Sequence, residues 1–124
     1  MVTVVDPLGT PVPVYNRSGT AIVELPGGLV GAPTLIPTVS KETIVNVTYI
    51  DLVNDGRYFI LPDDVDVGDV IEVYTSVGAA PQIFPPSGET FLDGGAGAIS
   101  VSGAHNSIRF RRVTSTGWGV LQSI

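Results

Sequence analysis

The longest stretch of the chain without glycine or proline covers residues 38–55 and reads TVSKETIVNVTYIDLVND. Nine of its residues are β-branched, and such side chains favour a strand over a helix because their rotamers are restricted. In a strand, Val45, Val47 and Tyr49 share one face, and Ile44 lies on the other. Because both faces are partly apolar, we expect this strand to be covered on both sides.

Glycine and proline interrupt the chain on either side of this stretch, with 15 glycines and 10 prolines in 124 residues. The segments between them are short and rich in Val, Ile and Thr, which is typical of strands bounded by turns. After residue 40, we predict strands at 43–50, 57–61, 69–77, 82–84, 99–101, 107–113 and 118–122. This spacing predicts an all-β fold of short antiparallel strands in a β-sandwich, a barrel or a trimeric β-prism. No internal repeat is evident.

The first 40 residues differ from the rest because they hold six of the ten prolines. Each proline removes a backbone donor from a sheet. We therefore predict an extended, proline-rich N-terminal arm or a small β-meander at residues 1–40, and a β-domain at residues 41–124. Small ribbons are marginal alone, so the arm is expected to lie along a partner.

The composition restricts the kinds of partner. Only 15% of the residues are charged, against about 25% in an average soluble domain, so we expect subunit contacts to cover part of the surface. The net charge of −6 disfavours nucleic acid, whose backbone is anionic. No apolar segment approaches the ~20 residues that span a bilayer, and the first residues lack the features of a secretory signal. We expect synthesis in a cytoplasm, without membrane association.

Asp63, Asp64, Asp66 and Asp69 invite a comparison with calcium-binding loops. An EF-hand loop requires glycine at its sixth position. A loop that began at Asp64 would place Asp69 there and Gly68 at the fifth position, so the pattern fails. We interpret the segment as a solvated turn between strands, with a calcium site of a type other than the EF-hand as the alternative, and we expect no metal and no cofactor.

His105 is the only histidine, and Asp93, Ser102 and Ser107 are near it in the sequence. A hydrolase triad needs a strained nucleophile turn such as Gly-x-Ser-x-Gly, which does not occur here. The run Gly95-Ala96-Gly97 is followed by neither a lysine nor a helical pattern, so it indicates a loop rather than a phosphate site. We expect no enzymatic activity.

Arg109, Arg111 and Arg112 supply half of the six basic residues. On one strand, Arg109 and Arg111 share a face and Arg112 lies on the opposite face. Because acidic residues outnumber basic ones twelve to six, we expect these arginines to pair with Asp63 and Asp64 of a neighbouring subunit in an ionic interface. Alternative binding partners for these arginines are a carboxylate-rich protein shell and a glycan.

Five short segments follow one another in a distinctive order. They are Tyr58-Phe59-Ile60-Leu61-Pro62, Val67-Gly68-Asp69-Val70-Ile71-Glu72-Val73-Tyr74, Ile83-Phe84-Pro85 with Gly88, Ile108-Arg109-Phe110, and Gly117-Trp118-Gly119-Val120. In this order, over residues 57–122, the chain resembles the small trimeric β-domains of tailed-phage virions, which occur in head-decoration proteins, head fibres and tail fibres. The spacing also makes physical sense, because Pro62 ends a strand and Gly68 permits a positive φ before the next one.

The resemblance implies a homotrimeric structural protein of a bacteriophage virion. The chain begins at Met1 and has no repetitive shaft, which favours a capsid decoration protein on the exterior of the shell, bound to the major capsid protein. The alternative is a tail-fibre or receptor-binding module that recognises a host surface glycan through the loops around Gly94 and His105.

Two groups of residues are candidate contacts under this interpretation. The arm would touch the capsid through Val4, Val5, Pro7, Val12, Tyr15 and Arg17. Trimer formation and packing would depend on Val45, Val47, Tyr49, Ile71, Val73, Phe110 and Trp118.

Overall fold

The computed structural model of the chain describes residues 4–5, 11–12, 19–50, 53, 56–75, 80–92, 95–101 and 106–123. The described residues form strands and turns and no helix, so the predicted all-β class is confirmed. One sheet has six strands in the order β3 (Thr20–Pro26), β5 (Glu42–Tyr49), β7 (Val70–Thr75), β11 (Asn106–Arg112), β12 (Gly117–Ser123) and β9 (Thr90–Phe91). A second sheet has four, in the order β10 (Ile99–Ser100), β8 (Gln82–Phe84), β6 (Tyr58–Ile60) and β4 (Thr34–Leu35).

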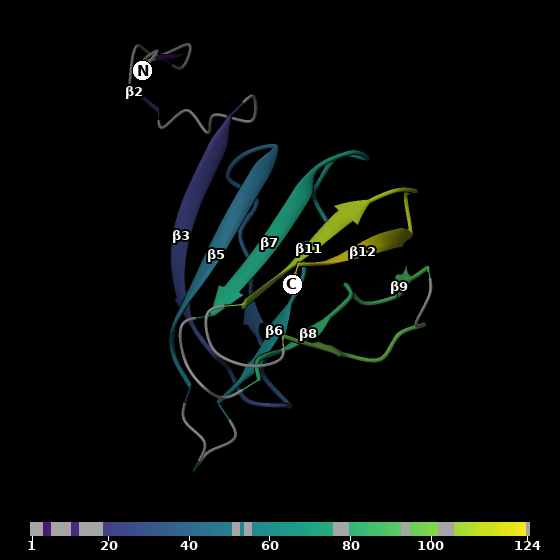
Figure 1. The fold of residues 1–124 in the computed structure, drawn as a ribbon. Helices are drawn as coiled ribbons and strands as arrows, with labels where there is room; N and C mark the ends of the chain where they lie inside the picture. Colours follow the sequence, from purple (N-terminus) through teal and green to yellow (C-terminus); the bar gives the residue numbers. More distant parts are fainter. Residues whose placement is uncertain are drawn as a thin grey trace.

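The chain winds between these two sheets in three solenoid-like coils, namely β3–β4, β5–β6 and β7–β8 (Figure 1). Thr20 pairs with Glu42 and Glu42 with Val70, so successive coils are offset by 22 and then 28 residues. Within each sheet, the strands of the three coils are parallel. The prediction of antiparallel strands is wrong for this part, because each excursion through the opposite sheet returns the chain in its original direction.

The antiparallel part of the fold lies after the third coil. β11 and β12 form a hairpin, and β11 pairs antiparallel with β7. β9 then pairs parallel with β12, so the hairpin is inserted between the third coil and the strand that follows it (Figure 1). β10 pairs antiparallel with β8 at one edge of the four-stranded sheet.

A proline follows three of the four strands in the four-stranded sheet, namely β4, β6 and β8, at the same level. Leu35 pairs with Ile60, and Ile60 pairs with Phe84. Two positions after each of these residues the chain has a proline, at positions 37, 62 and 86. Because proline cannot donate a hydrogen bond to a sheet, these residues end the three strands and define one corner of the coil. The repeat is therefore structural, although no repeat is evident in the sequence.

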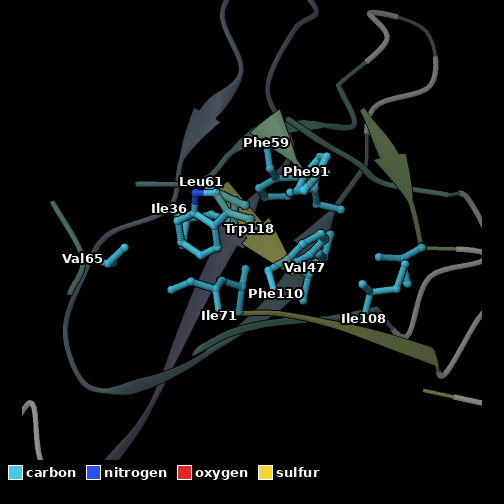
Figure 2. Close-up of a cluster of buried hydrophobic side chains, with 14 residues drawn as sticks. Ile36, Val47, Phe59, Leu61, Val65, Ile71, Phe91, Ile108, Phe110 and Trp118 are labelled. Carbon is cyan, nitrogen blue, oxygen red and sulfur yellow. The ribbon is translucent and has the colours of Figure 1, made fainter. Parts of the chain in front are cut away.

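The hydrophobic core lies between the two sheets (Figure 2). Its largest fully buried side chains are Trp118, Phe59, Phe91 and Phe110. The ring centroids of Phe91 and Phe110 are 5.5 Å apart, close enough for the rings to interact directly. Phe91 is on β9 and Phe110 is on β11, and β12 lies between these two strands in the sheet. The contact between the rings therefore joins the C-terminal hairpin to the rest of the core.

The strand β5 is fully covered on one face only. Val45 and Val47 are buried, whereas Ile44 on the opposite face is half-buried. Leu25 pairs with Val47 but Pro26 pairs with Tyr49, so the register shifts by one residue at Thr48. This bulge turns Tyr49 away from the core face, and its side chain is 58% exposed. The expected coverage of both faces, with Tyr49 beside Val47, is therefore wrong.

Residues 20–40 belong to the first coil and not to an arm. β3 pairs with β5 along its whole length, and β4 pairs with β6. The chain between them approaches the second coil closely, because a Cβ atom on Gly27 would lie 2.1 Å from the carbonyl oxygen of Gly56. The prediction of a separate segment up to residue 40 is thus corrected here, since strand pairing outweighs the proline content.

Most of the predicted arm contacts lie outside the described residues. β1 (Val4–Val5) and β2 (Pro11–Val12) pair as an antiparallel ribbon, so the candidate residues Val4, Val5 and Val12 are on its strands. Pro7, Tyr15 and Arg17 are outside the described residues. Capsid contact by this segment stays a prediction.

Candidate functional site

The three arginines of β11 lie as the sequence predicts, with Arg112 facing inward and Arg109 and Arg111 facing outward. Arg112 is buried, Arg109 is half-buried, and Arg111 is exposed. The alternation of a strand therefore sends the same type of side chain into two different surroundings.

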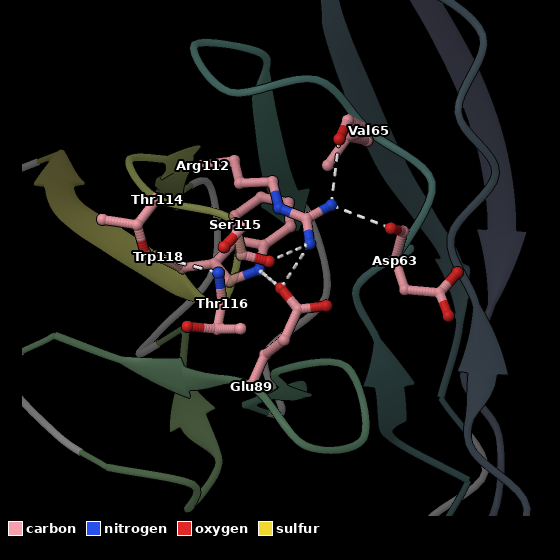
Figure 3. Close-up of polar contacts among 8 residues, drawn as sticks. All are labelled: Asp63, Val65, Glu89, Arg112, Thr114, Ser115, Thr116 and Trp118. Carbon is pink, nitrogen blue, oxygen red and sulfur yellow. Dashed lines mark hydrogen bonds and ion pairs between the residues drawn. The ribbon is translucent and has the colours of Figure 1, made fainter.

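Arg112 is the centre of a buried polar cluster (Figure 3). Its Nη1 atom donates to the carbonyl oxygens of Asp63 at 2.8 Å and Val65 at 2.9 Å. Its Nη2 atom donates to Glu89 Oε1 at 2.9 Å and to the carbonyl oxygen of Ser115 at 2.6 Å. One guanidinium thus joins the corner after β6, the corner after β8 and the turn of the last hairpin.

Glu89 completes this cluster by accepting two hydrogen bonds on one oxygen. Its Oε1 atom accepts from Arg112 and, at 3.0 Å, from Trp118 Nε1. The side chains of Arg112 and Glu89 are each only 8% exposed. A buried ion pair contributes little by itself, but removal of one partner leaves the other charge uncompensated. We call Arg112, Glu89 and Trp118 the corner clamp, and its geometry makes it a structural element.

Arg109 forms ion pairs on the outer face of the six-stranded sheet. Its Nη2 atom lies 2.6 Å from Glu42 Oε1, and its Nε atom lies 3.3 Å from Glu72 Oε1. These side chains are partly exposed, at 39% for Arg109 and 37% for Glu42. Since Glu42 and Glu72 come from neighbouring coils, Arg109 links the second coil, the third coil and the hairpin.

The acidic partners predicted for these arginines are different in the structure. Asp63 contributes its backbone carbonyl oxygen to Arg112, and Asp64 Oδ1 accepts a hydrogen bond from Thr38 Oγ1 at 2.6 Å. Within the described residues, the ion pairs of Arg109 and Arg112 are formed with glutamates instead. Pairing between subunits stays a prediction, with Arg111, Asp63 and Asp64 as its exposed members.

The residues predicted for trimer contact and packing are nearly all in the core of a single chain. All of them except Tyr49 are at most 1% exposed, namely Val45, Val47, Ile71, Val73, Phe110 and Trp118. They pack between the two sheets. A second subunit therefore has no access to these six side chains in the folded chain.

The aspartates of the corner after β6 form a local turn. The Asp66 backbone N–H donates to Asp69 Oδ2 at 3.2 Å, and the Asp69 backbone N–H donates to the Asp66 carbonyl oxygen at 3.0 Å. Gly68 has a φ of 100°, as expected before this strand. Asp63, Asp64 and Asp66 are exposed whereas Asp69 is buried, so the segment is a solvated turn, as predicted, except at Asp69. Among the described residues, no group of three or more metal-ligating side chains occurs.

The glycine-rich loop and the residues around His105 form no chemical site within the described part of the chain. Gly95 exchanges backbone hydrogen bonds with Phe91 at 2.8 and 3.0 Å, so its N–H group is already engaged in a turn. Gly94, Asp93, Ser102 and His105 lie outside the described residues. No helix in the described part of the chain is long and apolar enough to cross a membrane.

The outer face of the four-stranded sheet is a surface that the sequence analysis missed. Leu35, Ile60 and Phe84 lie side by side on it, in one row across β4, β6 and β8. Leu35 is 63% exposed, and the other two are half-buried. The sequence does contain a signal for this surface, because an apolar residue stands two positions before each of the prolines at 37, 62 and 86. We call these three residues the apolar row.

Two features flank the apolar row. At the start of β6, the Tyr58 ring stacks on Phe84 with centroids 5.7 Å apart, and the Arg57 guanidinium lies 5.8 Å from the Tyr58 ring centroid. At the ends of β4 and β6 there is an open groove of about 330 Å³. It is lined by Leu35, Ile36, Pro37, Thr38, Pro62, Asp63 and Asp64, and we call it the acidic groove.

No protein-family model and no curated protein matches the chain. The function of the chain is therefore inferred from the surfaces described above and from the order of sequence segments over residues 57–122.

Proposed function

We propose that this protein is a non-enzymatic structural protein of a tailed-phage virion, namely a homotrimeric capsid decoration protein. In this proposal it binds the exterior of the shell through the major capsid protein. The resemblance of residues 57–122 to small virion β-domains gives the class of protein. The observation that carries the proposal is the apolar row, which lies on a regular sheet and is partly exposed to solvent in the single chain, most of all at Leu35.

The apolar row supports a protein contact because of where it lies. Apolar residues gathered on one exposed face are typical of protein-protein interfaces. The row is held by backbone pairing in three parallel strands, so the backbone that carries its side chains is in place before a partner arrives. A preorganised surface loses less conformational entropy on binding. This surface is therefore suited to a permanent assembly.

The buried polar groups support a structural role over catalysis. The hydrogen bonds of Arg112 and Glu89 are made to each other, to Trp118 and to backbone carbonyl oxygens. These groups therefore fix the corners of the coil. Catalytic groups, by contrast, must face a substrate.

The trimer that we propose is a β-prism, in which each subunit turns its four-stranded sheet toward a common axis. Burial of apolar surface between subunits would stabilise the trimer. Binding of the trimer across adjacent capsid subunits would stabilise the shell, because a partner that binds only the assembled form shifts the equilibrium toward it. The ribbon and the segment around it remain the proposed contact with the shell.

The test is a binding assay with empty, expanded shells of the same phage. Purified protein is mixed with shells and sedimented, while its mass in solution is measured by light scattering. We expect a trimer that sediments with the shells in a saturable way. A protein that binds no shells but adsorbs to host cells or a glycan array would refute the decoration role in favour of receptor binding.

A further inference from the structure

We infer that one copy of this chain binds the next through two different patches on the four-stranded sheet, with Arg57 and Tyr58 of one copy seated at the acidic groove of its neighbour. The inference depends on the proposed function for the number of subunits. The two patches and their chemistry come from the geometry of the sheet alone.

The first patch is a cation supported by aromatic rings. Arg57 lies 5.8 Å from the Tyr58 ring centroid, and Tyr58 stacks on Phe84 at an angle of 23°. Tyr58 is fixed further by backbone hydrogen bonds in both directions with Gly28, each 2.9 Å long. The patch therefore presents a guanidinium and an aromatic ring in a defined orientation, a combination that is enriched at protein interfaces.

The second patch is a groove with an apolar floor and an acidic rim. Leu35, Pro37 and Pro62 supply apolar lining, and Asp63 and Asp64 supply carboxylates. The rim is held in place, because Asp64 accepts a hydrogen bond from Thr38 and the Asp63 backbone is bound by Arg112. Carboxylates beside apolar walls suit a guanidinium that is carried on an aromatic ring.

The two patches lie at opposite ends of the same strand. Tyr58 begins β6 and Pro62 follows its end, which corresponds to about 13 Å at about 3.3 Å per residue. The basic patch of one copy thus meets the acidic patch of the next when neighbours follow one another around an axis. Contacts between different patches are heterologous, and they form a closed ring when the rotation closes.

Charge also selects a second copy over other partners. The chain has twelve acidic and six basic residues, so most of the surface of a second copy repels the acidic groove. The patch at Arg57 differs because it carries a positive charge. A face-to-face contact of two identical grooves would oppose Asp63 to Asp63, which is unfavourable. The complementary patch is present on the same sheet, so a second copy is the occupant that we assign.

The experiment exchanges the two charges. We would measure the mass of the full chain by native mass spectrometry and light scattering for Arg57→Glu, Asp63→Lys and the double variant with both changes. Lys41→Glu is the matched control, because Lys41 is exposed directly before β5 of the other sheet. Thermal unfolding of each variant confirms that it is folded.

We expect each single charge reversal to weaken self-association at least tenfold, and the double variant to form trimers again. Mixed with wild-type protein, the double variant should form no mixed trimers, since like charges then meet. Folded single variants that remain fully trimeric, or a folded double variant that stays monomeric, would overturn the inference. A monomeric wild-type protein would also overturn it, whereas binding of that protein to shells would leave the decoration role standing.

Discussion

The inner and outer sides of β11 place arginines in opposite surroundings. On the inner side, Arg112 is enclosed in the corner clamp and contacts three separate turns of the chain. On the outer side, Arg109 forms two ion pairs that are open to water. The outer contacts contribute less to stability, because water and salt replace them at little cost. Burial decides which arginine the fold depends on.

The largest effect is expected from Arg112→Ala. The substitution leaves the Glu89 carboxylate buried without its cation, and the loss of stability should be about 3–5 kcal/mol. Urea unfolding measures it, with Arg111→Ala as the control on the same strand, where we expect a change within about 0.5 kcal/mol. Equal effects from the two substitutions would remove the distinction between the two sides of the strand.

A smaller effect is expected from Glu89→Gln, which keeps the size of the side chain and its acceptor oxygen but removes the charge. A hydrogen bond to a charged group contributes about 1.5–3 kcal/mol, and the loss of stability should fall in this range. Trp118 is the only tryptophan, so its fluorescence reports directly on the clamp. An unchanged unfolding midpoint and an unchanged emission spectrum would show that the charge of Glu89 is dispensable.

The smallest effect is expected from Arg109→Ala on the outer side. Exposed pairs contribute about 0.2–1 kcal/mol, and we expect the difference from wild type to shrink as the salt concentration rises. Unfolding curves at low and high salt test this. A loss that matches that of Arg112→Ala, or one that salt leaves unchanged, would contradict the assignment of Arg109 to an open surface.

Local features of this fold could be predicted from the sequence. The β-branched stretch around Val45 and Val47 indicates a buried strand, and both residues are in the core. The alternation of Arg109, Arg111 and Arg112 is also correct, because it requires only that residues 109–112 form a strand. Likewise, Gly68 takes the positive φ that its place before a strand indicates.

The direction of strand pairing could not be predicted in the same way. Parallel and antiparallel strands need similar residues, and the coil appears only when residues more than 20 positions apart are paired, as Thr20 and Glu42 are. The bulge beside Leu25 likewise has no local signal, and it moves Tyr49 away from Val47. The clamp was missed because Glu89 and Arg112 are distant in the sequence, although each is the type of residue that is buried only when paired.

The insertion of the β11–β12 hairpin has a consequence for the synthesis of the protein. β9, at residues 90–91, finds its neighbour in the six-stranded sheet only at residues 117–118 of β12. Because a ribosome releases the chain from its N-terminus onward, the three coils emerge while the place beside β7 is still empty. β12 therefore completes the sheet, and a chain that stops before residue 117 leaves β9 without its neighbouring strand and Glu89 without the hydrogen bond from Trp118.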